Sequence, residues 1–113
     1  MPIVVQKHKG FEFTTHNDEE ISDLHTGNKG TLLTDYETIK KVFGEPNTDF
    51  ECGHQTDAHW TIQFLDGQVG TIYNWKNGKN YCDAYELEDI PEWEVGGKTS
   101  EVYERINKML GLD

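Results

Sequence analysis

The feature that most constrains the fold is a pair of turn signals inside residues 60–82. Trp60 to Phe64 alternates apolar and polar side chains, Asp66-Gly67 follows, and Val69 to Trp75 resumes a β-prone pattern. Asp-Gly is preferred in two-residue hairpin loops because both of its positions tolerate positive φ. A hairpin with that loop would pair residues on one shared face, namely Phe64 with Val69, Ile62 with Thr71 and Trp60 with Tyr73.

The second turn signal, Asn77-Gly78, lies inside the stretch YNWKNGKNY at residues 73–81. It predicts a second hairpin, in which Lys76 and Lys79 flank the turn and Trp75 lies opposite Asn80. Residues 60–82 would then form an antiparallel meander, and residues 92–95 are expected to add a further strand after Pro91.

A helix is expected to begin at Thr34-Asp35-Tyr36-Glu37, because the Thr-x-x-Glu spacing is typical of a capping box with Thr34 as the N-cap. Ile39, Val42 and Phe43 then fall on one face of that helix. Gly44, followed by Pro46, is expected to end it.

A second helical pattern runs from Thr99 to Leu110, with Thr99 or Ser100 as its N-cap. Its apolar stripe consists of Val102, Tyr103, Ile106, Met109 and Leu110. A meander covered on one face by both helices buries the two apolar stripes. The sequence therefore predicts an α+β fold, an antiparallel β-meander of about three to five strands packed on one face by two short helices.

The amino-terminal part has the least regular pattern. Ile3-Val4-Val5 and Phe11 to Thr14 are β-prone, Gly10 separates them, and a polar run follows. Residues 1–30 are therefore expected to form an edge hairpin or arm and then a loop. At 113 residues the chain has the length of a single domain, 1–113, with its core in residues 31–113.

The composition is strongly acidic, with 21 Asp and Glu against 10 Lys and Arg and a formal net charge of −11. Such a charge repels duplex phosphates and anionic lipid. No apolar stretch approaches the roughly 18 residues of a spanning helix, and the first residues lack the pattern of a secretory signal. We therefore expect a cytoplasmic protein without a cofactor that binds neither duplex DNA nor a membrane, and its oligomeric state stays open.

The stretch from Gly70 to Tyr81, followed by Trp93 to Gly97, resembles the shared core of a family of small uncharacterised proteins encoded by tailed bacteriophages and large DNA viruses. That core reads T-I-Y-[N/D]-[W/Y]-K-x-G-K-x-Y and then W-x-[I/V]-G-G, and the similarity covers about residues 32–110. Glu94 departs from it, since histidine is as common there. The resemblance implies a viral accessory protein, and it transfers no catalytic residue.

An acidic segment between Tyr81 and Gly96 is the candidate partner-binding surface. Its members are Asp83, Glu86, Glu88, Asp89 and Glu92. A concentrated negative charge can dock on a basic patch of another protein, for example a host nuclease, and block it. The sequence therefore favours a non-enzymatic protein that inhibits a host factor, and a solvated loop is the alternative interpretation of the same charges.

A second hypothesis is an anion or nucleotide site at the hairpin and the start of the second helix. A Gly-Gly turn before a helix presents free N–H groups, lysines add charge, and aromatic rings can stack on a base. Its candidate residues are Tyr73, Trp75, Lys76, Lys79, Tyr81, Trp93, Gly96, Gly97, Lys98 and Thr99, with the lysines expected to converge. The same residues are compatible with an ordinary braced hairpin.

A zinc site or a small enzyme is the third hypothesis. Two cysteines and two histidines, namely Cys52, His54, His59 and Cys82, could supply four zinc ligands, but their spacing is irregular for a zinc finger. No base is held beside a nucleophile by the sequence pattern. We therefore expect folding without zinc and no catalysis.

Overall fold

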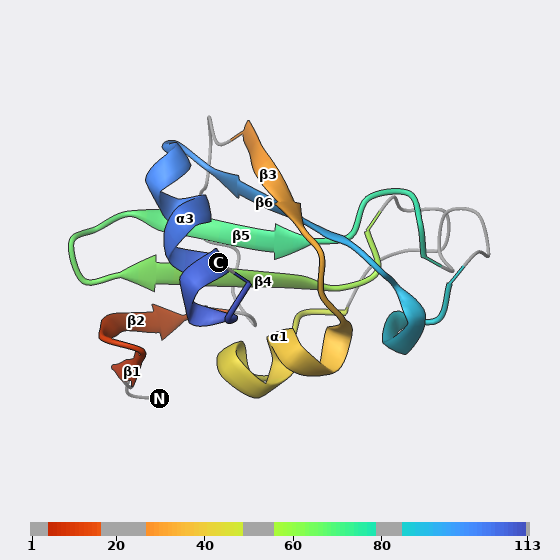
Figure 1. The fold of residues 1–113 in the computed structure, drawn as a ribbon, viewed down its shortest axis with the longest axis horizontal. Coiled ribbons are helices and arrows are strands. Elements are labelled where there is room, and N and C mark those ends of the chain that lie inside the picture. The colour runs from red at the N-terminus through yellow and green to blue at the C-terminus, as the bar shows by residue number, and fades with distance from the viewer. Residues whose placement is uncertain (1–4, 17–26, 49–55, 79–84, 113) are drawn as a thin grey trace.

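The computed structural model describes residues 5–16, 27–48, 56–78 and 85–112 of the chain. Within these ranges the chain forms a six-stranded antiparallel sheet in the order β1-β2-β4-β5-β6-β3 (Figure 1). The strands are β1 (Gln6–His8), β2 (Phe11–Thr15), β3 (Gly27–Leu32), β4 (His59–Phe64), β5 (Val69–Tyr73) and β6 (Trp93–Gly97). The other described elements are the helices α1 (Tyr36–Phe43) and α3 (Ser100–Met109) and the 3-10 turn η1 (Leu87–Asp89).

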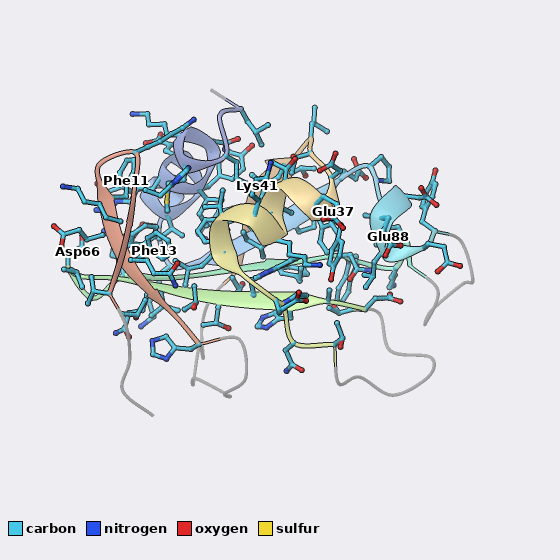
Figure 2. The ribbon with its side chains drawn as sticks, turned by 90° about the horizontal axis from the view of Figure 1, so that it is seen from below. Phe11, Phe13, Glu37, Lys41, Asp66 and Glu88 are labelled. Carbon is cyan, nitrogen blue, oxygen red and sulfur yellow. The ribbon has the colours of Figure 1, made fainter. Side chains whose placement is uncertain are left out.

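Both helices lie on the same face of the sheet, as Figure 2 shows from below. The core between the two layers contains the fully buried side chains of Phe13, Ile39, Phe43, Trp60, Ile62, Ile72, Trp93, Val95 and Ile106. The apolar stripes of α1 and α3 point into this core. Their burial stabilises these helices, which are too short to be stable on their own. The predicted α+β fold is confirmed.

The β4–β5 hairpin forms, but its register differs from the prediction by one residue. The Phe64 N–H donates to the carbonyl of Gln68 at 2.8 Å, which leaves a loop of three residues that ends in Gly67 at φ 93°. Three-residue loops require a left-handed residue at this position, and glycine supplies it. Trp60 therefore pairs with Ile72, so Tyr73 lies on the opposite face. The predicted pairs are wrong, namely Phe64 with Val69, Ile62 with Thr71 and Trp60 with Tyr73.

The described strand that pairs with β5 on the side away from β4 is β6, and the predicted third strand of the meander, residues 79–82, lies outside the described residues. β5 has β4 on one side and β6 on the other, with Tyr73 opposite Glu94. After Asn77-Gly78 the chain instead places Gly78 in a parallel bridge with Tyr85. The strand expected after Pro91 is confirmed as β6. Lys79, Asn80 and Tyr81 lie outside the described residues.

The amino-terminal hairpin is confirmed as an edge element. His8 pairs with Phe11, and the two residues between them, Lys9 and Gly10, have φ of 50° and 87°. Positive φ at both positions is the conformation whose twist suits a tight hairpin. This hairpin places β1 at one edge of the sheet.

Strand β3 forms the opposite edge, in a segment that the sequence predicts to be a loop. Its register shifts between Asn28 and Gly30, where Asn28 Oδ1 accepts the Gly30 N–H at 2.9 Å. Gly30 allows the ring of Tyr103 to approach, since a Cβ there would lie 2.5 Å from it. The Tyr103 hydroxyl then donates to the carbonyl of Thr31 at 2.7 Å. Contacts with α3 thus hold a strand whose own sequence has little β-propensity.

Helix α1 begins one residue later than predicted. Its N-cap is Asp35, whose Oδ1 accepts the Thr38 N–H at 2.9 Å, so the predicted cap at Thr34 is wrong. The side-chain hydrogen bond from Thr38 is the main reason why the pKa of Asp35 lies below its usual value. Gly44 ends the helix at φ 82°, as predicted, and its carbonyl accepts the indole N–H of Trp60 at 2.7 Å.

Helix α3 lies directly on the backbone of β5, because Gly70 has no Cβ to collide with Val102. Thr99 is the N-cap by position, but its hydroxyl donates to Gln68 Oε1 at 2.7 Å and does not cap the helix. Among the described residues, neither this helix nor the other has the length and apolar character needed to cross a bilayer.

Candidate functional site

The exposed carboxylates of η1 are held in place by a buried anchor. Ile90 is fully buried and Leu87 packs against the core, while Glu86, Glu88 and Asp89 are exposed. The turn closes through the Asp89 N–H, which donates to the carbonyl of Glu86 at 2.9 Å. The apolar residues thus fix the turn, and the acidic side chains point outward from it.

Helix α1 adds Glu37 to these carboxylates, and Figure 2 shows Glu37 and Glu88 on neighbouring elements. Tyr36, the residue before Glu37, is buried against the rings of Trp60 and Trp93, at centroid distances of 5.8 and 6.2 Å. Burial is the main cause of the raised pKa of Tyr36, with Lys40 opposing and nearby glutamates, including Glu37 and Glu88, adding to it. We call the exposed carboxylates of Glu37, Glu86, Glu88, Asp89 and Glu92 the acidic end.

The loop after β5 is braced by Asn74, which is fully buried. Asn74 Oδ1 accepts the N–H groups of Asp57 and Ala58 at 2.7 and 3.1 Å, and its Nδ2 donates to the Asp57 carboxylate at 3.0 Å. Gly78 completes the brace, because a Cβ at that position would collide with Asp57. The first half of YNWKNGKNY is therefore a rigid loop whose asparagines and glycine have structural roles.

Asn77 joins this loop to the acidic end. Its Nδ2 donates to the carbonyl of Glu92 at 3.4 Å, and its own carbonyl accepts the Tyr85 N–H at 3.3 Å. Large side chains are exposed here, with Trp75 at 51% and Tyr85 at 44% of their full accessible area. Leu33, which follows the residue paired with Trp93, is 74% exposed. The acidic end is therefore bordered by apolar side chains.

Trp75 has one aromatic and one cationic neighbour. Its ring meets that of Tyr73 edge to face, with 6.3 Å between centroids and 83° between planes. The Lys76 ammonium lies over the indole, 5.6 Å from its centroid. Lys76 has φ 58°, a left-handed conformation that is uncommon for a residue with a side chain.

Tyr73 lies beside a polar cluster on the sheet face away from the helices. The Glu94 carboxylate accepts the Asn28 amide at 2.8 Å and the Thr31 hydroxyl at 3.0 Å. Burial chiefly raises the pKa of Tyr73, against the lowering effect of a hydrogen bond with Asn28, while Glu94 raises it further. Gly96 provides room for these side chains, because a Cβ there would collide with the Thr71 hydroxyl.

The residues predicted for an anion site do not converge. Gly96 and Gly97 pair with Thr71 and Gly70 within β6, so the predicted Gly-Gly turn is wrong. Because Tyr73 pairs with Glu94, Lys76 follows β5 at the end where β6 begins, whereas Lys98 and Thr99 follow the other end of β6. Lys76 and Lys98 therefore do not converge, which contradicts the prediction for this pair.

Trp93 does not belong to an exposed anion site as predicted, because it is fully buried on the helix-covered face of the sheet. Tyr73 and Trp75 do come together, and Lys76 joins them. Lys79 and Tyr81 lie outside the described residues, as does Asp83 of the predicted acidic surface.

Of the four residues predicted as zinc ligands, His59 is the one within the described residues. His59 begins β4, pairs with Tyr73 and bridges Asn47. Cys52, His54 and Cys82 lie outside the described residues. In the ranges that the structure describes, no three His, Cys, Asp or Glu side chains gather as metal ligands would.

A groove of about 650 Å³ lies between α1, the β1–β2 turn and the end of α3. Basic groups line it, including Lys9 and Lys41, with Met109 among its apolar residues. Several of these groups have structural partners: His8 Nε2 donates to the Met109 carbonyl at 2.9 Å, and Lys40 pairs with Glu45 at 3.3 Å. Asp35 and Glu37 also line the groove, so basic and acidic groups meet in it, and Glu37 belongs both to the groove and to the acidic end.

Sequence reasoning missed Glu37, Leu33 and Tyr85 as members of the acidic end and its border. Glu37 follows the N-cap of a helix, where an acidic residue is usual, so its local pattern suggested only helix stabilisation. Leu33 and Tyr85 lie far apart in the sequence, and only strand pairing brings them near Glu92.

Comparison of the chain with protein-family models, with curated proteins and with solved structures finds no match in any of the three. Function must therefore be inferred from the residues of the acidic end and its surroundings.

Proposed function

We propose that this protein is a non-enzymatic binding module that docks on a basic surface of another protein through its acidic end. The observation that carries the proposal is the combination of outward carboxylates on an anchored turn with the exposed side chains of Trp75, Tyr85 and Leu33. Protein interfaces commonly join a few aromatic or aliphatic anchors to a polar rim.

The net charge of −11 supports the same function, because a strong negative potential accelerates the encounter with a basic partner. The turn that carries Glu88 and Asp89 is fixed by the buried Ile90. Binding through a preorganised turn loses less conformational entropy than binding through a mobile loop. Steering by the overall charge and rigidity of the turn favour docking over simple solvation of the carboxylates.

In the viral setting that the resemblance implies, the partner is a host protein in the cytoplasm. A basic surface on such a protein commonly handles nucleic acid, since phosphate contacts are made by lysine and arginine. Occupation of that surface by the acidic end excludes the nucleic acid, and inhibition follows without a catalytic step or a cofactor.

The experiment compares two charge variants of equal net charge. Glu88→Gln with Asp89→Asn removes two carboxylates from the acidic end, and Glu12→Gln with Glu104→Gln removes two exposed carboxylates from β2 and α3. Proteins retained by the immobilised wild-type chain from a host lysate are purified, and their affinities for all three forms are measured by calorimetry at low and high salt.

We expect the acidic-end variant to weaken binding roughly threefold to tenfold and to reduce its salt dependence, because each interface charge contributes modestly when solvent is near. The variant of Glu12 and Glu104 is expected to bind as the wild type does. Equal affinities for the two variants would contradict docking through the acidic end.

A further inference from the structure

We propose that Trp75 is a receptor for an arginine side chain, so that the partner's docking segment is recognised by guanidinium stacking as well as by charge. This inference rests on the docking function proposed above and names the chemistry of the partner. Its basis is the environment of the indole, which carries a cation in the structure and is 51% exposed.

The position of Lys76 indicates what the indole can bind. Its ammonium lies 5.6 Å from the ring centroid, within the range in which a cation is attracted by the negative face of an aromatic ring. Indole is the strongest of the side-chain rings in this interaction. A partner cation can take the place of the Lys76 ammonium, because the side chains of two adjacent loop residues can move apart without unfolding the sheet.

The loop presents the indole in a fixed orientation. Asn74, one residue earlier, is fully buried and holds the loop to Asp57 and Ala58. Lys76, one residue later, has the left-handed φ of 58°. Unfavourable backbone conformations persist where the surroundings enforce them, and they are frequent at binding sites. A rigid aromatic surface binds a cation at a lower cost in conformational entropy than a mobile one.

Two segments that carry carboxylates are hydrogen-bonded to the same loop and supply the second part of an arginine site. Asn77 holds the Glu92 backbone beside the loop at 3.4 Å, and Glu86 follows Tyr85, whose N–H is bound to the same Asn77. A guanidinium can stack on an aromatic face while its edge donates to a carboxylate. Lysine has a compact, strongly hydrated ammonium and cannot do both as well. The site therefore distinguishes arginine from lysine at equal charge.

The probes are two fluorescein-labelled nonapeptides, one of arginine and one of lysine, titrated in fluorescence anisotropy with the full chain. The variants are Trp75→Ala, which removes the ring and its apolar bulk, and Trp75→Leu, which removes the ring but keeps an apolar side chain. Leu65→Ala is the matched control, since Leu65 is 58% exposed in the β4–β5 loop, at the opposite end of β5. Circular dichroism checks that each variant is folded.

We expect the arginine peptide to bind the wild type and the Leu65→Ala control roughly twofold to fivefold more tightly than the lysine peptide, the ratio expected for an exposed cation–π contact. Trp75→Ala and Trp75→Leu are expected to bring the ratio to about one.

Equal binding of both peptides to the wild type would overturn the arginine inference and leave the docking function standing. An equal weakening of both peptides in Trp75→Leu would also overturn it, by making Trp75 an apolar anchor without preference. Absence of binding by either peptide at low salt would contradict the docking function itself, and the arginine site with it.

Discussion

At the scale of single residues, the most consequential side chain is Asn74. Its amide satisfies two backbone N–H groups and contacts the Asp57 carboxylate from a fully buried position. Alanine at position 74 would leave those N–H groups without this acceptor. Buried polar groups without a partner cost about 1–3 kcal/mol each, so the loop that carries Trp75 depends on one asparagine.

We therefore expect Asn74→Ala to lower the free energy of unfolding by roughly 2–4 kcal/mol in a urea titration. Asn77→Ala is the matched control, because Asn77 is only half-buried and its hydrogen bonds, to the Glu92 carbonyl at 3.4 Å and from Asn74 Nδ2 at 3.3 Å, are long, so its replacement is expected to cost less than about 1 kcal/mol. Similar unfolding midpoints for the two variants would show that Asn74 does not brace the loop.

The cap of α1 makes a second prediction at this scale. Asp35→Ala is expected to cost about 1 kcal/mol, whereas Thr34→Ala is expected to be nearly neutral. The pKa of Asp35 is depressed by its hydrogen bond to Thr38, so the cap stabilises the protein above the unfolded pKa of about 4 and is lost as pH falls through the folded pKa. Urea titrations at neutral and acidic pH test both statements, and a larger loss for Thr34→Ala would restore the capping box.

At the scale of elements, α3 is fastened to the β4–β5 loop by Arg105. Its guanidinium donates to both Asp66 oxygens at 3.2 and 2.7 Å and to Glu101 at 2.9 Å, and it stacks on Phe64 at 4.9 Å. This pairing places the pKa of Asp66 well below its usual value, chiefly through the hydrogen bond from Arg105. A carboxyl whose pKa is depressed in the folded state stabilises the fold at pH values above its unfolded pKa. This stabilisation is lost as the pH falls.

Asp66→Asn is therefore expected to lower the Tm more at pH 6 than at pH 2, because the stabilisation from the depressed carboxyl pKa falls once the unfolded carboxyl is protonated, below about pH 4. Glu104→Gln, on the same helix but outside this network, serves as the control and is expected to change the Tm little at either pH. Thermal melts across this range decide the matter, and an equal Tm loss at both pH values would show that the contact does not depend on the charge of Asp66.

Four of the helices and strands could be predicted from local sequence pattern. Apolar stripes at helical spacing identify α1 and α3, and alternation of apolar and polar residues identifies β4 and β5. The register could not, since Asp66-Gly67 suits a two-residue loop while Gly67 closes a three-residue one. Asn77-Gly78 is a strong local turn signal, but the tertiary contacts of Asn74 determine the loop. Strand β3 could not be predicted, because Gly-Asn-Lys-Gly has low β-propensity and the strand is stabilised by contacts with α3.

At the scale of the whole molecule, charge is distributed unevenly. The acidic end gathers carboxylates around η1 and from Glu37 of α1, and Glu37 also lines the groove between α1 and α3, together with several lysines. The acidic surface itself could be predicted from the run of carboxylates between Tyr81 and Gly96. The apolar border could not, because it depends on long-range pairing, which places Leu33 and Trp75 after the strands on either side of β6 and joins Tyr85 to Gly78.

The irregular edge strand β3 has a consequence for the behaviour of many copies in solution. An exposed regular edge offers its amides and carbonyls to a strand of a neighbouring molecule, which is how sheets grow into fibres. Here the register shift breaks the row, Asn28 occupies the Gly30 amide and Tyr103 occupies the Thr31 carbonyl. The strand that looks least like one in the sequence is thereby a poor template, which protects this edge from strand-by-strand polymerisation.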